Sequence, residues 1–191
     1  MESWGGESKP FEAFFFGVLQ PTMRQPNTST LSQGLCLPYP EFPRDNSSIS
    51  LMESVKAMIK RHEGCRLKTY NDTTGHKTIG YGHKQIHNTI QTITQTQADA
   101  FFESDFQTAK SGAQGLVENW ASLNSVRQGV LIDLVFNLGV AGVRNFRKMR
   151  AAIEDSDFST AADEMLDSRW ATQVQQDRVT DLTNMMRTGE E

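Results

Sequence analysis

The sequence predicts an α+β protein made of a small β-hairpin lobe and a larger, mostly helical lobe, preceded by an irregular N-terminal arm. All six prolines lie at or before Pro43, so the start of the chain differs from the rest. In residues 66–83 the residue types alternate with a period of two, as in strands. In the segments on either side, apolar residues recur at helical spacing. Helical spacing then continues almost to the last residue, which favours a helical lobe joined to the hairpin by a long helix.

Residues 1–49 are expected to form an extended arm and linker, and residues 50–191 one folded domain. Proline removes a backbone hydrogen bond and breaks helices, so the arm has at most short strands, of which Phe14–Leu19 is the best candidate. Five of the eleven phenylalanines lie in this arm. Disordered segments are usually poor in aromatic residues, so we expect the arm to pack against its own domain or against a partner.

The folded domain is expected to begin with a helix that ends at a candidate acid. Ser50–Glu53 has the Ser-x-x-Glu pattern of a capping box. Val55 and Ile59 place an apolar stripe on this helix, and Gly64 is a typical helix stop. Glu63 follows Ile59 by four residues, so its side chain lies on the buried side of the helix end.

A small antiparallel sheet with a turn at Asp72–Gly75 is expected next, followed by helices. Thr94 is a candidate N-cap for the joining helix. Asn124 or Ser125 caps a run so apolar that it must form a central, buried helix. The expected helices cover residues 94–111, 126–138, 143–153, 158–168 and 174–187.

Composition argues against several classes of partner. The net charge is −4, which gives no reason to expect binding to nucleic acid. The two cysteines, Cys36 and Cys65, lack metal-ligand spacing, so neither a metal nor a cofactor is expected. The two thiols are either unpaired or, if the protein works outside the cytoplasm, joined in a disulfide. No run reaches the ~18–20 apolar residues of a membrane span. Phe11–Leu19 contains Glu12 and lacks the basic flank and cleavage site of a signal peptide.

Glu63 and Asp72 form a candidate acid–base pair. Glycoside hydrolysis uses one protonated carboxylic acid and one carboxylate on the other side of the sugar. Burial on the helix face is expected to favour the neutral form of Glu63, whereas a polar turn keeps Asp72 ionised, and Thr78 can bind a water between them. The spacing alone favours the plainer interpretation, a surface glutamate and an ordinary turn aspartate.

The segment Glu63–His83 resembles the catalytic segment of the T-even type phage lysozymes, a family of glycoside hydrolases. The family motif is Glu, eight residues, Asp, five residues, Thr and then Ile-Gly-x-Gly-His, and Glu63, Asp72 and Thr78 match it position by position. The resemblance does not cover the arm. It covers about residues 50–189 and continues through LVFNLG (134–139), SRW (168–170) and RTG (187–189).

The resemblance implies a lysozyme-like two-lobed fold and hydrolysis of the β-1,4 bond between N-acetylmuramic acid and N-acetylglucosamine in peptidoglycan. It assigns Glu63 as the general acid. Asp72 assists the attacking water or stabilises positive charge at the anomeric carbon, and Thr78 holds that water. Phe136 matches a phenylalanine that lines the substrate cleft. The family and the water-holding threonine favour hydrolysis with inversion of configuration.

The resemblance also implies charged pairs that support the site. His83 and Asp105 match a His–Asp pair across the lobe junction. Arg178 falls where the family places an arginine beside the catalytic glutamate; the alternative is an exposed helical arginine. Where the family often pairs an aspartate with a second arginine, this chain has His62 and Asp181. These side chains are still complementary, so we predict that they lie within about 6 Å of each other.

The sequence therefore predicts an active lysozyme that acts on the bacterial cell wall. The alternative is a virion or wall-binding module that keeps the fold without turnover. Two routes to the wall are open. One is carriage on a phage tail or baseplate through residues 1–49, and the other is release from the host cytoplasm through a holin-made membrane hole. An extended arm rich in phenylalanine and proline suits docking on a partner surface, which favours the tail.

Overall fold

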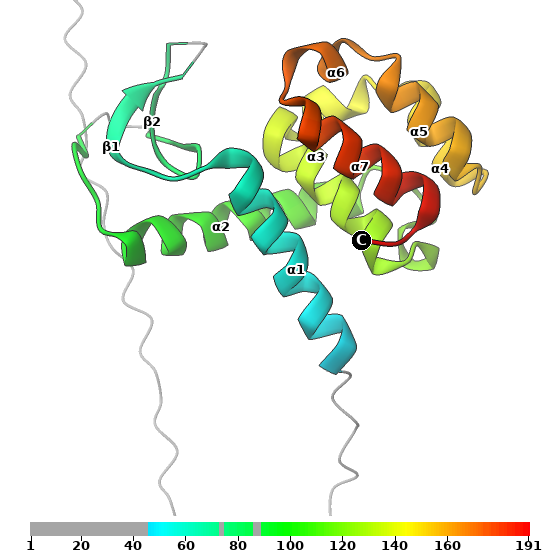
Figure 1. Cartoon of the computed structure of the whole chain (residues 1–191), viewed down its shortest axis with the longest axis horizontal. Helices are drawn as coiled ribbons and strands as arrows, with labels where there is room; N and C mark the ends of the chain where they lie inside the picture. The colour runs from blue at the N-terminus through cyan, green and yellow to red at the C-terminus, as the bar shows by residue number, and fades with distance from the viewer. Residues whose placement is uncertain (1–45, 73–74, 86–88) are drawn as a thin grey trace, which may run out of the picture. The chain divides into compact units, whose positions relative to one another are not determined.

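The computed structural model describes residues 46–72, 75–85 and 89–191, where the chain forms a small sheet and a group of helices (Figure 1). The predictions for the arm, including a strand at Phe14–Leu19 and the state of Cys36, lie outside these residues. Cys65 is an exposed free thiol. The predicted α+β class, with a small strand lobe and a larger helical lobe, is confirmed.

The helices and strands follow one another in the predicted order, with one additional short helix near the end of the chain. The strands are β1 Arg66–Asn71, β2 Lys77–Gly80 and β3 His83–Lys84. The helices are α1 Asn46–Glu63, α2 Gln95–Gln114, α3 Ser125–Arg144, α4 Arg147–Glu154, α5 Phe158–Leu166, α6 Arg169–Gln173 and α7 Gln176–Thr188, with a 3-10 turn η1 at Trp120–Ser122.

The start of α1 differs from the prediction. The helix begins at Asn46, so the prediction that Ser50 opens it is wrong, and part of the expected linker is helical. Serine favours a cap but also tolerates a helix interior, so a capping pattern does not stop a helix that continues before it.

The end of α1 is as predicted and fixes the position of the candidate acid. Gly64 has a φ of 64°, a left-handed conformation that glycine adopts at little cost. Its N–H donates to the carbonyl of Lys60 at 3.0 Å and closes the helix. Val55 and Ile59 have no exposed surface, so the apolar face anchors α1 and holds Glu63 at the end of a rigid element.

The three strands form an antiparallel sheet in the order β1-β2-β3. Tyr70 pairs with Thr78 across the first two strands, and Thr78 pairs with Lys84 across the next two. The lobe has a small core of its own, formed by Ile79, Ile93 and Ala98. Ala98 belongs to α2, so the sheet depends on the first turns of that helix for its packing.

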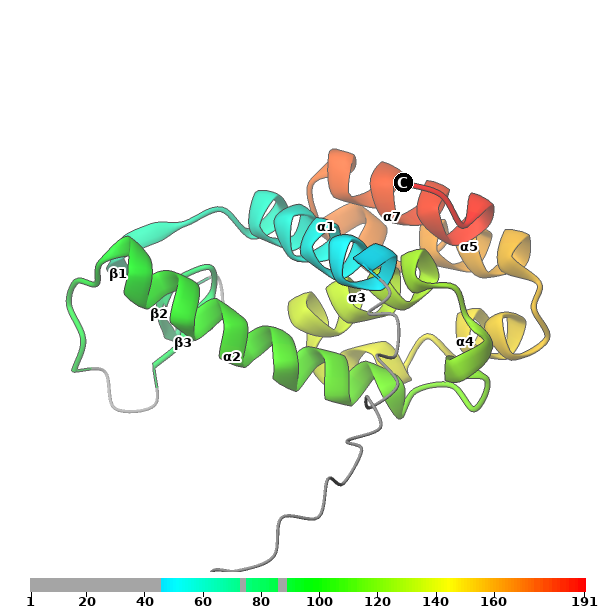
Figure 2. The ribbon, with the colours of Figure 1, turned by 90° about the horizontal axis from the view of Figure 1, so that it is seen from below.

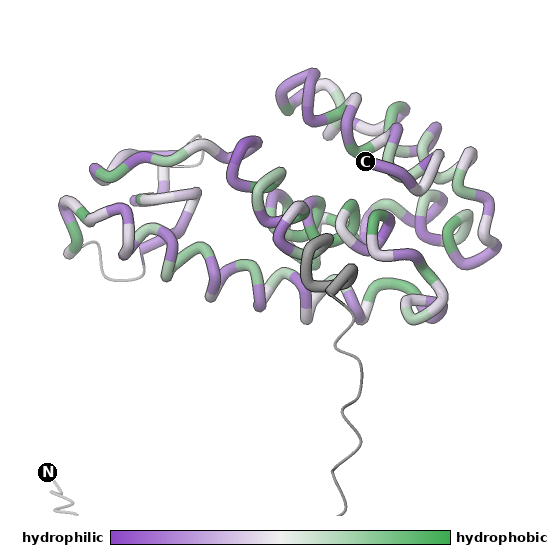
Figure 3. The backbone as a smooth tube through the Cα atoms, turned by 60° about the horizontal axis from the view of Figure 1, so that its bottom comes forward, coloured by the Kyte–Doolittle hydropathy of each residue, from purple (hydrophilic) through white to green (hydrophobic). Residues whose placement is uncertain are grey.

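Helix α2 joins the two lobes, running from the sheet to the helical group in Figure 2. The predicted cap is confirmed, since Thr94 and Gln97 form a reciprocal capping box. Hydrophobic and hydrophilic residues alternate along the helix in Figure 3, as expected for an amphipathic element. Phe102 and Phe106 point into the main core, whereas Ala98 belongs to the core of the sheet lobe.

Helix α3 is the central helix of the helical lobe. Its predicted N-cap is confirmed, because the Asn124 side chain accepts from the backbone N–H of Arg127. The helix was expected to stop at Leu138, but it resumes beyond a non-helical Gly139 (φ 69°, ψ 165°) and ends at Arg144. Among the described helices, α3 alone is long and apolar enough for a membrane span. Core helices meet the same criteria, and half of its most apolar window is buried inside the protein.

A close helix crossing places α1 against α3. A β-carbon on Gly129 of α3 would lie 2.6 Å from Cγ2 of Val55 in α1, so only a residue without a side chain fits there. This crossing brings the end of α1 alongside the middle of α3, where the charged groups of the site meet.

Gly129→Ala is expected to lower the free energy of unfolding by about 1–3 kcal/mol, because the added methyl overlaps Val55. Denaturant titration followed by circular dichroism measures the change. Adding Val55→Ala should make the double variant less destabilised than the sum of the two single changes. Gly115→Ala is the matched control, since its nearest neighbour would be 3.9 Å away. An unchanged midpoint for Gly129→Ala would contradict the close crossing.

Candidate active site

Glu63 is the last residue of α1 and lies in an ion pair. Its side chain is 18% exposed, and its Oε1 accepts a hydrogen bond from Arg178 Nη1 at 2.8 Å. Arg178 comes from α7 and is buried, so the alternative of an exposed helical arginine is wrong. The predicted contact between these residues is confirmed, although Glu63 is held by a cation as well as by the apolar helix face.

Arg178 also contacts a second carboxylate, which the sequence reasoning missed. Asp133 lies in the middle of α3 and has no exposed surface. Its Oδ1 accepts from Arg178 Nε at 2.8 Å and lies 2.6 Å from Nη2, and its Oδ2 lies 2.9 Å from His62 Nδ1. The sequence did contain a signal for this contact. Asp133 is the one charged residue in the apolar run VLIDLVF, and a buried charge requires partners.

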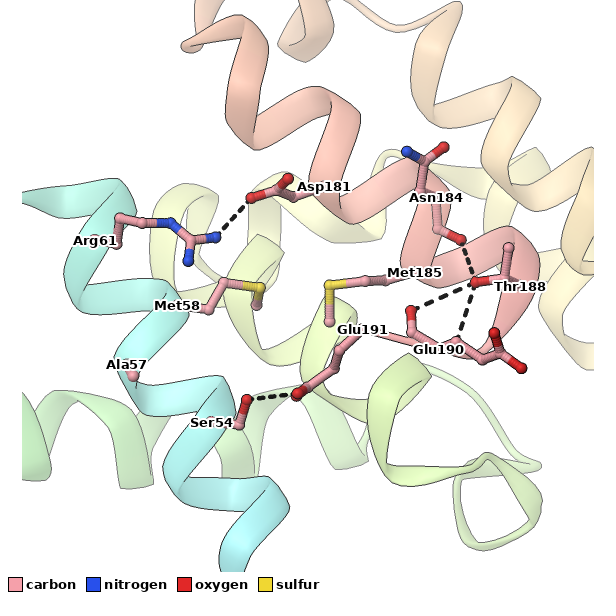
Figure 4. A pocket seen from close by; sticks show the side chains of 10 residues that line it. All are labelled: Ser54, Ala57, Met58, Arg61, Asp181, Asn184, Met185, Thr188, Glu190 and Glu191. Carbon is pink, nitrogen blue, oxygen red and sulfur yellow. Dashed lines mark hydrogen bonds and ion pairs between the residues drawn. The ribbon is translucent and has the colours of Figure 1, made fainter.

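The predicted proximity of His62 and Asp181 is confirmed. His62 Nε2 lies 3.3 Å from Asp181 Oδ2, inside the expected range, and this confirms the register assigned to α7. Arg61 also binds Asp181, at 2.7 Å. Figure 4 shows Arg61 and Asp181 beside a pocket of about 570 Å³ between α1 and α7. None of the three predicted catalytic residues lines that pocket, so its size does not mark the reactive site.

Asp72 lies in the predicted turn of the hairpin. Its carbonyl accepts from Gly75 N–H at 3.0 Å, and its Oδ1 accepts from the N–H of His76 at 2.8 Å. Oδ2 lies 3.8 Å from the ammonium group of Lys84 on β3. A backbone donor and a nearby ammonium group therefore both lie beside this carboxylate.

Thr78 lies at the second position of β2, and it is almost fully buried. Its hydroxyl donates to the carbonyl of His76 at 3.1 Å. The only hydrogen of the hydroxyl is used in this bond, so Thr78 can offer a lone pair to a water molecule but not a second donor.

The hairpin and the end of α1 face each other. The β-carbon of an alanine at position 82 would lie 3.6 Å from Glu63 Oε2, which places Gly82 directly against the carboxylate. Burial raises the pKa of the Tyr70 phenol. Arg66 lowers it, and the negative charges of Glu63 and Asp72 raise it further. Both carboxylates therefore act on one side chain of β1.

The predicted His–Asp pair is present at the junction of the lobes. His83 Nδ1 lies 2.9 Å from Asp105 Oδ2 of α2, and the imidazole stacks on Phe101 at a ring separation of 4.5 Å. These two residues and Phe136 line a pocket of about 420 Å³ between the sheet and α3. Phe136 therefore shares a pocket with two residues of the lobe junction, and its role in substrate binding remains a prediction.

This geometry defines a class of protein. A glutamate at a helix end and an aspartate in a facing hairpin turn, with a buried threonine beside it, can protonate a glycosidic oxygen and activate a water. The profile of the phage lysozyme family matches residues 60–189. The chain belongs to the phage lysozyme family, and it is a glycoside hydrolase that acts on peptidoglycan.

Similar proteins come from phages and from a eukaryote. A probable T4-type lysozyme of Dictyostelium discoideum is 29% identical over 65% of this chain and 88% of its own length. The endolysin of Acyrthosiphon pisum secondary endosymbiont phage 1 is 30% identical over 63% of this chain and 80% of its own length. The pre-baseplate central spike protein Gp5 of Enterobacteria phage T4 is 32% identical over 80% of this chain, but the chain spans only 30% of that spike protein.

Gly82→Ala is expected to reduce turnover as well as stability. Its φ of 91° is unfavourable for alanine, which costs about 1–2 kcal/mol, and the methyl would stand against Glu63 Oε2 where substrate approaches. Gly139→Ala is the control, because its φ of 69° brings similar strain with nothing within 4 Å and it lies outside the hairpin that carries Asp72. Peptidoglycan turnover and denaturant titration separate the two effects. Equal turnover in both variants would show that Gly82 does not border the reactive carboxylate.

Proposed function

We propose that this lysozyme cleaves the β-1,4 bond between N-acetylmuramic acid and N-acetylglucosamine, with Glu63 as the general acid. The observation that carries the proposal is the orientation of its carboxyl group. Oε1 is held by Arg178, so Oε2, which faces Gly82 of the hairpin, is the oxygen available to carry a proton to the leaving group. The Glu63 proton passes to the glycosidic oxygen as the bond to the anomeric carbon breaks.

The nucleophile in this proposal is a water on the opposite side of the sugar. The N–H of His76 holds the Asp72 carboxylate in the turn, and this carboxylate accepts a proton from the water or stabilises positive charge at the anomeric carbon. Thr78 accepts a hydrogen bond from the same water, because its own hydrogen is used by His76. Attack from the far side inverts the configuration of the anomeric carbon.

Glu63→Gln is expected to reduce the lysis of outer-membrane-permeabilised cells to background, because glutamine keeps the shape of the side chain but has no acidic proton to transfer to the leaving group. Turbidity loss measures this, and proton NMR of the first product should show the inverted anomer for the unmodified protein. Glu53→Gln is the matched control on the same helix, since Glu53 is exposed and binds only Lys56 among the described residues. Equal lysis by Glu63→Gln and unmodified protein would favour the non-catalytic wall-binding module instead.

We also propose that the enzyme travels on the phage particle, through residues 1–49, rather than being released as an endolysin. The spike protein of phage T4 aligns with 80% of this chain, which is more than the segment from Asn46 onwards can supply. That similarity therefore includes at least a few residues before Asn46, whereas the lysozyme and endolysin relatives cover 56–65% of the chain. A segment shared with a central spike protein supports docking on a tail or baseplate.

Deletion of residues 1–45 is expected to remove the enzyme from purified phage particles while leaving lytic activity in solution. The deletion retains the whole of α1 and everything after it. Immunoblots of particles and a turbidity assay of the purified protein measure the two properties. Particles that never contain the full-length enzyme would favour the endolysin route, and a rise in activity after deletion would favour an arm that covers the substrate cleft.

A further inference from the structure

Asp133 is the one acidic side chain in the middle of the apolar helix α3. Its neighbours Ile132 and Leu134 and the carboxylate itself have no exposed surface. Removing a carboxylate from water is unfavourable unless cations and hydrogen bonds replace the lost hydration. Neither the general acid nor the water-activating carboxylate of the proposed mechanism is Asp133, so this buried charge has no assigned function.

The contacts of Asp133 determine how the Arg178 guanidinium is oriented. Asp133 Oδ1 binds Nε and Nη2, and its backbone carbonyl lies 3.4 Å from Nη2. A guanidinium group is planar and rigid, so fixing Nε and Nη2 also fixes the direction of Nη1. Nη1 is the atom that binds Glu63 Oε1 at 2.8 Å.

The second oxygen of Asp133 is fixed from another helix. His62 of α1 contacts Asp133 Oδ2 through Nδ1, and its Nε2 faces Asp181, which is bound in turn by Arg61. Neither carboxylate oxygen of Asp133 can turn away from its partner without losing a contact. The carboxylate is thus held by α1 and α7 at once, and it holds Arg178 in a single orientation.

We propose that Asp133 is a positioning residue for Glu63 that acts through Arg178. This inference rests on the proposed role of Glu63 as the general acid. Asp133 directs Nη1 at Glu63 and shares the positive charge of the guanidinium. An unshared guanidinium would stabilise the ionised form of Glu63 more strongly and leave less of the protonated acid that the reaction needs. The charged or titratable side chains that face this arrangement are His62 from α1, Tyr70 from β1, Asp72 from the hairpin, and Arg178 and Asp181 from α7.

The test is the pH dependence of peptidoglycan hydrolysis by Asp133→Asn in the full-length protein. Asparagine keeps the size of the side chain and an oxygen acceptor but removes the charge. We expect kcat to fall at least about tenfold with little change in KM, because the acid is displaced. The alkaline limb of the kcat/KM profile should move to lower pH, because the guanidinium group beside the acid has lost its counter-charge.

Two further variants show whether the effect passes through Arg178. In an Arg178→Gln background, adding Asp133→Asn should cause no additional shift of the alkaline limb, since the shared cation is already absent. Asp163→Asn is the matched control for charge. Asp163 is exposed and binds Arg187 at 2.6 Å outside this network, and its variant should keep the profile of the unmodified enzyme.

Thermal unfolding of each variant identifies loss of folded protein. If Asp133→Asn does not fold, Arg178→Lys replaces it, because lysine keeps the charge but cannot span both carboxylates. We expect the same loss of kcat in that folded variant.

Unchanged kcat and an unchanged alkaline limb in the folded variant, or an equal shift in the Arg178→Gln background, would overturn the proposal. Full lysis by Glu63→Gln would instead overturn the catalytic assignment itself, so the two failures are distinguishable.

Discussion

The guanidinium group of Arg178 lies between two carboxylates that come from different helices. Glu63 is at the end of α1, Asp133 is in the middle of α3, and the cation itself belongs to α7. Each of these helices is held in place by its own apolar contacts with the main core. Gly129 lets α1 and α3 approach closely where they cross. The ion pairs then depend on that packing, because a buried charge is tolerated only when its partner is already in reach.

The division into two lobes gives the two carboxylates of the proposed mechanism different surroundings. Glu63 is fixed by the main core and by a buried cation, whereas Asp72 lies in a hairpin turn, where it binds the backbone of Gly75 and His76 and lies near Lys84. The hairpin packs on a small core at one end of α2, and the same helix contributes Phe102 to the main core. Helix α2 therefore connects the hairpin that carries Asp72 to the core that holds Glu63.

Sequence patterns predicted the parts of the site that depend on short segments. The hairpin motif placed Asp72 and Thr78, and the register of α7 placed Arg178 and Asp181 close to the end of α1. Asp133 was missed because its contacts depend on three helices that meet at one point. The spacing of residues within one segment does not reveal such a meeting. The earlier start of α1 and the resumption of α3 after Gly139 were missed because a capping pattern or a glycine does not by itself fix where a helix begins or ends.

The partners in the central ion pair are separated by 115 residues of chain. Almost the whole domain thus forms a loop that is closed when α7 docks against α1 and α3. A nascent chain that has emerged only as far as α6 carries Glu63 without its cation and leaves Asp133 with one partner fewer. The lysozyme activity therefore belongs to the completed domain, and no fragment that ends before α7 contains the same site.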